Sequence, residues 1–97
     1  QEALRRFDPT QETYSNMGLL YARQKKYEKA ELFFRKALEI NPQNEGVWVN
    51  LGHTLSEMSS PDKKREAISA YQSVTQEMYD RLRLDTIVTR LEYELQN

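Results

Sequence analysis

Apolar side chains recur at helical spacing along most of this 97-residue chain. The clearest runs are Tyr14, Met17 and Tyr21; Ala30, Phe33, Phe34, Ala37 and Leu38; and Leu84, Ile87, Val88, Leu91 and Leu95. Residues three and four apart share one face of an α-helix, so each run predicts an amphipathic helix with one face to bury. The chain is rich in Ala, Leu, Glu, Lys, Arg and Gln and poor in β-branched residues, which gives strands no support.

Prolines and capping residues set the expected helix limits. Pro9 and Pro42 each close a segment, because the residue before a proline is pushed out of the α region. Thr10 and Asn44 then stand at N-cap positions, and Pro61 suits the first turn of another helix. We therefore expect helices at about 11–24, 27–40, 45–57, 62–79 and 82–96, with residues 1–7 as the end of an earlier helix.

The first two predicted helices are repeated in the next two. At an offset of 34, Tyr14 pairs with Trp48, Asn16 with Asn50, Met17 with Leu51, Gly18 with Gly52 and Tyr21 with Leu55. The offset then becomes 37, and Ala30 pairs with Ala67, Phe34 with Tyr71 and Ala37 with Val74. Three extra residues have therefore entered the second unit, around positions 58–63.

This pattern resembles the tetratricopeptide repeat (TPR), a helix–turn–helix unit of about 34 residues. The unit at 9–42 keeps Tyr14, Met17, Gly18, Tyr21, Ala30, Phe34, Ala37 and Pro42 of the family signature. The unit at 43–79 keeps Trp48, Leu51, Gly52, Ala67 and Tyr71, but has Leu55 for the usual Tyr, Val74 for the usual Ala and no terminal Pro. Residues 1–8 are interpreted as the tail of a preceding repeat, and residues 80–97 as a capping helix.

The resemblance implies one all-α domain, a right-handed helical-repeat array of antiparallel helix pairs. Small residues are expected where two helices approach closely, because a larger side chain would overpack the contact. These are Gly18, Gly52, Ala30, Ala37 and Ala67. Tyr21 and Phe34 are expected to fill the space between the helices of the first pair.

Composition narrows the possible functions. The net charge of −1 and the pI of about 5.9 indicate no global field that would attract nucleic acid or anionic lipid. The absence of cysteine excludes a disulfide framework, a thiolate zinc site and a Cys nucleophile. No apolar run approaches the length of a membrane span, and the first residues do not form a signal peptide. The compartment stays open, with the cytoplasm as the default; we expect a piece of a longer protein.

Catalytic chemistry has little support. His53 is the only histidine, and Glu57 is its only carboxylate neighbour at helical spacing. The Ser and Thr residues lack a partner base and a Gly-rich elbow, so nucleophilic catalysis is not expected. Basic clusters at 5–6, 25–26 and 63–65 fall at predicted turns and are interpreted as solvated. We predict no enzyme activity, no cofactor, no metal site, and neither nucleic acid nor membrane as a partner.

Asn16 and Asn50 are the candidates for binding. Asn is a mediocre helix former with no packing reason to recur at equivalent places, although chance recurrence is an alternative. The resemblance implies that this helix face lines a concave groove, where an Asn amide donates to and accepts from the backbone of an extended peptide. Neighbours on the same face would set side-chain preference: Glu12, Leu19, Arg23, Val49, His53 and Glu57. Ser15 and Leu19 replace the Lys and Asn of the clamp for chaperone termini, so that ligand is not supported.

The sequence thus predicts a non-enzymatic scaffold for protein–protein interaction, with a partner peptide or helix in the concave groove. The alternative is a structural segment that self-associates into a homo-oligomer or packs within a larger multi-repeat protein. That alternative follows from residues 1–7, which are too few to form a stable helix pair over the apolar face beside them.

Overall fold

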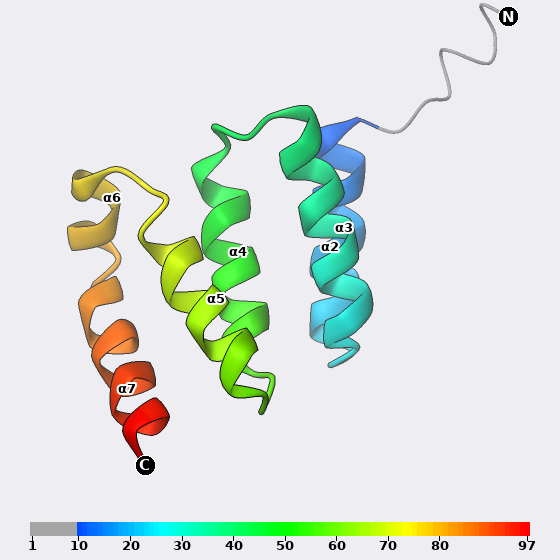
Figure 1. Ribbon diagram of the computed structural model, residues 1–97. Helices are drawn as coiled ribbons and strands as arrows, with labels where there is room; N and C mark the ends of the chain where they lie inside the picture. The colour runs from blue at the N-terminus through cyan, green and yellow to red at the C-terminus, as the bar shows by residue number, and fades with distance from the viewer. Residues whose placement is uncertain (1–9) are drawn as a thin grey trace, which may run out of the picture.

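The computed structural model describes residues 10–97, which form six helices and no strand. They are α2 (Gln11–Arg23), α3 (Tyr27–Ile40), α4 (Glu45–Ser56), α5 (Pro61–Tyr71), α6 (Gln76–Arg81) and α7 (Leu84–Gln96). Figure 1 shows α2 and α3 as one antiparallel pair, α4 and α5 as the next, and α7 beside α5. The predicted all-α helical-repeat fold is confirmed for these residues, and the expected tail at 1–8 lies outside them.

Three predicted helix starts are confirmed by their caps. The Thr10 hydroxyl accepts a hydrogen bond from the backbone N–H of Thr13 at 3.2 Å, at the start of α2. The Asn44 side chain accepts one from the N–H of Val47 at 3.2 Å, at the start of α4. Pro61 occupies the first turn of α5, where a missing N–H is harmless. Local sequence therefore fixes where these helices begin.

The prediction of one helix over 62–79 is wrong. Helix α5 ends at Tyr71, and α6 begins after Thr75, whose hydroxyl accepts from the N–H of Met78 at 3.3 Å. Near the break, the Ser73 hydroxyl donates to the carbonyl of Ser69 at 2.9 Å. Ser and Thr side chains compete with helix formation by bonding to nearby backbone groups, which explains an ending without Pro or Gly.

The helix predicted at 82–96 begins two residues later than expected, at Leu84. Arg83 adopts a left-handed backbone conformation with φ of 55° and separates α6 from α7. A non-Gly residue in that region cannot continue a right-handed helix. Beyond this kink, α7 buries Leu84, Val88 and Leu91 and packs against α5.

The same glycine–aromatic contact holds each helix pair together. A Cβ placed on Gly18 of α2 would lie 2.7 Å from a ring carbon of Phe34 on α3. A Cβ placed on Gly52 of α4 would lie 2.7 Å from a ring carbon of Tyr71 on α5. Both rings are fully buried, and so are Ala30, Ala37 and Ala67. The expected small-residue positions are therefore confirmed, and the glycines give the rings space to reach the neighbouring helix.

A charged network joins the two helix pairs at their outer edge. The Glu31 carboxylate on α3 accepts hydrogen bonds from Arg35 and from Lys63 on α5, each at 2.9 Å. Arg35 also donates to Glu66 of α5 at 2.7 Å. Burial raises the pKa of the Glu31 carboxyl, but the hydrogen bonds and charges of Lys63 and Arg35 outweigh it and hold that pKa below its ordinary value. The network therefore favours one alignment of α3 on α5.

We predict that Gly18→Ala and Gly52→Ala each lower the free energy of unfolding by about 1–2 kcal/mol, because overpacking outweighs the better helix propensity of Ala. Urea unfolding followed by circular dichroism measures the change. Gly46→Ala is the matched control, since its Cβ would meet only the Asn44 side chain, at 3.5 Å. This control should be neutral or stabilising by up to about 1 kcal/mol. Equal midpoints for all three variants would contradict the packing role of the two glycines.

Candidate functional site

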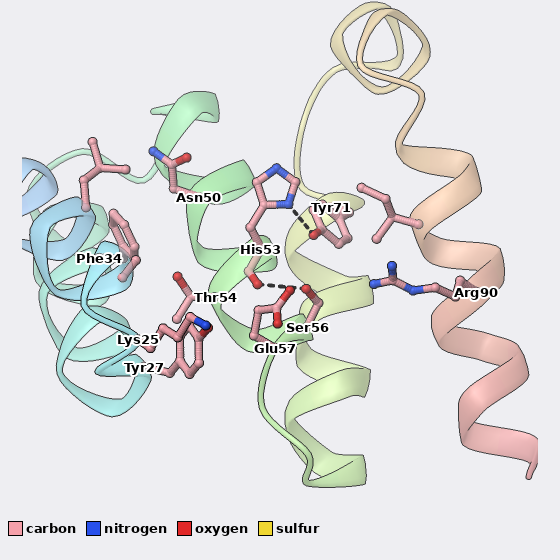
Figure 2. A pocket seen from close by; sticks show the side chains of 13 residues that line it. Lys25, Tyr27, Phe34, Asn50, His53, Thr54, Ser56, Glu57, Tyr71 and Arg90 are labelled. Carbon is pink, nitrogen blue, oxygen red and sulfur yellow. Dashed lines mark hydrogen bonds between the residues drawn. The ribbon is translucent and has the colours of Figure 1, made fainter.

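Helices α2, α4 and α7 line one groove. It encloses a cavity of about 590 Å³, with residues of α3 and α5 at its base. Leu19 and Ala22 come from α2, Asn50 and His53 from α4, Glu57 from the C-cap of α4, and Ile87 and Arg90 from α7. Figure 2 shows the α4 side chains in the middle, with the other two helices on either side. The groove thus joins parts of the chain that are far apart in sequence.

The repeat offset explains how these residues meet. Leu19, His53 and Arg90 occupy equivalent places, since 19 plus 34 is 53 and 53 plus 37 is 90. The buried faces agree with this register, because Leu84 and Val88 of α7 correspond to Val47 and Leu51 of α4 at the offset of 37. Helix α7 therefore stands where the first helix of a third unit would stand, although it lacks the glycine signature.

Four of the predicted groove residues line the cavity: Leu19, Asn50, His53 and Glu57. Glu12, Asn16 and Arg23 are exposed on α2 and do not line it. Val49 is 7% exposed and belongs to the hydrophobic core, so its side chain is not free to meet a ligand. Of the eight predicted residues, the structure thus brings Leu19 of the first repeat together with Asn50, His53 and Glu57 of the second.

Sequence reasoning missed several cavity residues, above all Arg90 and Ile87 on α7 and Lys25 in the turn after α2. Arg90 could have been found by extending the 37-residue offset from His53 into the last helix. Lys25 lies in a left-handed conformation with φ of 61°, which no repeat signature indicates. These residues add two positive charges to the rim, whereas Glu57 adds one negative charge.

A hydrogen bond links the groove to the core. His53 Nδ1 lies 2.7 Å from the hydroxyl of Tyr71, the ring that packs on Gly52 (Figure 2). Burial raises the pKa of Tyr71 to about 12, so this hydroxyl keeps its proton at neutral pH. His53 is exposed at its outer edge and partly buried at its ring. This burial lowers the pKa of the imidazole, and the negative charge of Glu57 offsets only part of the decrease. A neutral imidazole can accept a hydrogen bond from the Tyr71 hydroxyl at Nδ1, which leaves its Nε2–H as the donor available to the groove.

The groove combines hydrogen-bonding groups with apolar surface. Asn50 and His53 offer hydrogen-bonding groups, while Leu19, Ala22 and Ile87 offer apolar surface. Within residues 10–97, no group of three or more His, Cys, Asp or Glu side chains could hold a metal ion. The helices of the same region include none that is long and apolar enough to cross a membrane. An apolar surface with a few directed polar groups is typical of a ligand site.

Comparison with protein families agrees with this architecture. One tetratricopeptide repeat profile matches residues 12–44, and a second matches residues 33–66. Together they span more than half of the chain, from α2 into α5. The chain belongs to the tetratricopeptide repeat family. Searches of curated proteins and of solved structures found no match.

Membership in the TPR family sets the general role. TPR units generally mediate protein–protein interaction or act as scaffolds, and they are typically non-catalytic modules. The first matched segment contains both members of a glycine–aromatic contact, Gly18 and Phe34, whereas the second contains Gly52 and ends before its partner Tyr71. The matches end before α7, which contributes Ile87 and Arg90 to the groove.

We predict that His53 makes the fold less stable in mild acid. Its folded-state pKa lies below the ordinary value of 6.5, so the unfolded chain binds this proton more readily. At higher pH the imidazole is neutral in both the folded and the unfolded chain. As the pH falls through and below 6.5, the unfolded chain takes up the proton first, so the free energy of unfolding decreases. Urea unfolding at about pH 7.5 and about pH 5.5 should show a larger loss of stability for the parent chain than for His53→Gln.

His53 is the only histidine, so no other imidazole contributes to the difference between the two proteins. The Glu31 carboxyl, whose pKa is lowered from 4.5, titrates below this window in both proteins. If the two proteins lost the same stability between the two pH values, the His53 imidazole would not be desolvated in the folded state.

Proposed function

We propose that this TPR module binds an extended segment of a partner protein in the groove of α2, α4 and α7. The observation that supports this best is that Leu19, His53 and Arg90, at equivalent positions of α2, α4 and α7, all line one cavity of about 590 Å³. The backbone of an extended peptide repeats at a regular interval. A surface with equivalent positions on α2, α4 and α7 can therefore contact it at several places along its length.

Asn50 is the central recognition residue in this proposal. It lies on α4 beside the cavity, and its amide offers both a donor and an acceptor, as does each peptide unit of an extended chain. It can therefore hold a backbone without reading side chains. Asn16 is its equivalent on α2, exposed and outside the cavity, where it extends the same line of contacts.

Side-chain preference comes from the walls around Asn50. Leu19 and Ala22 on one side and Ile87 on the other favour an apolar side chain of the partner. At the rim, Lys25 and Arg90 are positive and Glu57 is negative, so we expect polar or charged groups on either side of that apolar side chain. Such rim charges contribute more to specificity and association rate than to affinity.

We predict that replacing both Asn16 and Asn50 by Ala weakens binding roughly tenfold to a hundredfold, since each hydrogen bond contributes about 0.5–1.5 kcal/mol. Peptides selected from a random displayed library on the parent chain serve as ligands, and calorimetry gives the dissociation constants. Asn50→Ala alone should account for most of the loss, because Asn50 lines the cavity and Asn16 does not.

Two controls separate binding from folding. The double variant should keep or slightly raise helix stability, because Ala is the better helix former. Arg65→Ala, exposed on α5 and away from the cavity, should leave affinity unchanged. Selected peptides that bound the double variant as tightly as the parent would contradict the role of the Asn pair; a large stability loss would assign these side chains to the fold.

A further inference from the structure

The extra segment of the second unit exposes two serines. Ser59 and Ser60 lie between α4 and α5 (Figure 1), where the second unit has three more residues than the first. The backbone of Ser60 is extended, with φ of −65° and ψ of 132°. Ser60 is the N-cap of α5, but its side chain accepts no hydrogen bond from the first turn, unlike Thr10 and Asn44 at the starts of α2 and α4. The Ser60 hydroxyl therefore has no role in capping α5.

The residues that follow Ser60 distinguish it from the other hydroxyls of the chain. It is the only Ser or Thr followed by Pro, and basic residues follow at 63–65. A proline-directed protein kinase accepts a hydroxyl residue whose next residue is Pro, which has no backbone N–H to satisfy. A cation three residues further on adds a charge-assisted contact to an acidic site on such a kinase. Pro61 and Lys63 meet both requirements, so the extra segment and the basic cluster form one motif.

The start of α5 can open without disturbing the core. No side chain of residues 59–64 is buried, and the first buried residue of α5 is Ala67. Charge holds this turn to the rest of the protein, since Lys63 and Lys64 donate to carboxylates of α3 and α7 at 2.9 Å and 3.0 Å. Exposed ion pairs are weak, and helix ends open locally at little cost. A kinase that binds its substrate in an extended form can therefore take up this segment from the folded protein.

We propose that Ser60 is phosphorylated by a proline-directed Ser/Thr protein kinase. The Ser60 Oγ forms a bond to the γ-phosphorus of ATP as the bond from that phosphorus to ADP breaks, and the hydroxyl proton passes to a base of the kinase. The product carries a charge of about −1.5 to −2 at the start of α5. The proposal is independent of the groove, because Ser60 does not line the groove cavity.

The phosphate competes with Glu31 for Lys63. Side chains at the N-cap and N3 positions of a helix lie close together, and in α5 these are Ser60 and Lys63. Both also line a second cavity of about 450 Å³, together with three carboxylates: Glu28, Glu31 and Glu57. Among the described residues that line this cavity, Lys63 is the only cation, so it is the group that attracts the phosphate. Phosphorylation then removes one of the links between α5 and α3, while Glu31 keeps its bond to Arg35.

Phosphorylation of the folded chain tests the proposal. The 97-residue chain and a synthetic peptide of residues 54–67 are each incubated with a purified proline-directed kinase and Mg-ATP, and mass spectrometry locates the phosphate. Ser60 should accept it in both, at a rate for the folded chain within about tenfold of that for the peptide, because only the start of α5 has to open. Pro61→Ala should nearly abolish the reaction. Ser59→Ala is the matched control and should leave the rate unchanged.

Lys63→Gln separates recognition from exposure. This change removes the bond to Glu31, so the turn opens more readily, yet loss of the cation should slow phosphorylation roughly threefold to tenfold. Circular dichroism verifies that the variants keep their helices. In the phosphorylated proteins, ³¹P NMR gives the second pKa of the phosphate, which is ordinarily about 6. That pKa should be lower in the parent than in Lys63→Gln, because the ammonium favours the dianion.

Three results would overturn the proposal. The first is the absence of phosphate on Ser60 of the folded chain, whether or not the peptide accepts it. The second is phosphate on Ser59 or another hydroxyl at a rate that Pro61→Ala leaves unchanged. The third is a phosphate pKa that is the same in the parent and in Lys63→Gln, which would exclude the pairing with Lys63.

Discussion

The close contact of a glycine with an aromatic ring is the constraint on which this structure depends. Gly18 receives Phe34, and Gly52 receives Tyr71, each with no space for a Cβ. This contact sets how closely the two helices of a pair approach. Because it occurs once in each pair, it also keeps the pairs alike, so that equivalent residues of α2 and α4 face the same side. The groove follows from that regularity.

The second pair adds a polar link that the first pair lacks. Tyr71 replaces Phe34, and its hydroxyl reaches His53 at the edge of the groove, 2.7 Å away. A buried ring that stabilises the fold thus also orients the His53 side chain, which lines the groove. Phe34 and Tyr71 pack alike, since both rings are fully buried against a glycine. Core and site are therefore coupled in the second unit more tightly than in the first.

The sequence was sufficient for features set by local chemistry or by the repeat. Thr10 and Asn44 were identifiable as caps, and Gly18 and Gly52 as close-contact positions, because each has a specific physical requirement. The division between α5 and α6 was missed, since Ser73 and Thr75 break the helix through side-chain hydrogen bonds without a Pro or Gly to mark it.

The site was predicted less completely than the fold. Asn50, His53 and Glu57 follow from the face of one helix, but Arg90 reaches the cavity only because α7 packs on α5. Val49 was expected in the groove and lies in the core, because α4 is covered by α3 on one side and α5 on the other. Whether such a residue lies in the core or in the groove depends on which helices pack around it. The hydrophobic pattern of one helix does not contain that information.

The most direct test of this account is a double-mutant cycle on Gly18 and Phe34. Urea unfolding is measured for the parent, Gly18→Ala, Phe34→Leu and the double variant. If the ring sets the approach of the helices, the smaller Leu should relieve the clash made by Ala, giving a coupling energy of about 0.5–3 kcal/mol. Losses that add within about 0.3–0.5 kcal/mol would show that the two residues act independently and would contradict the account.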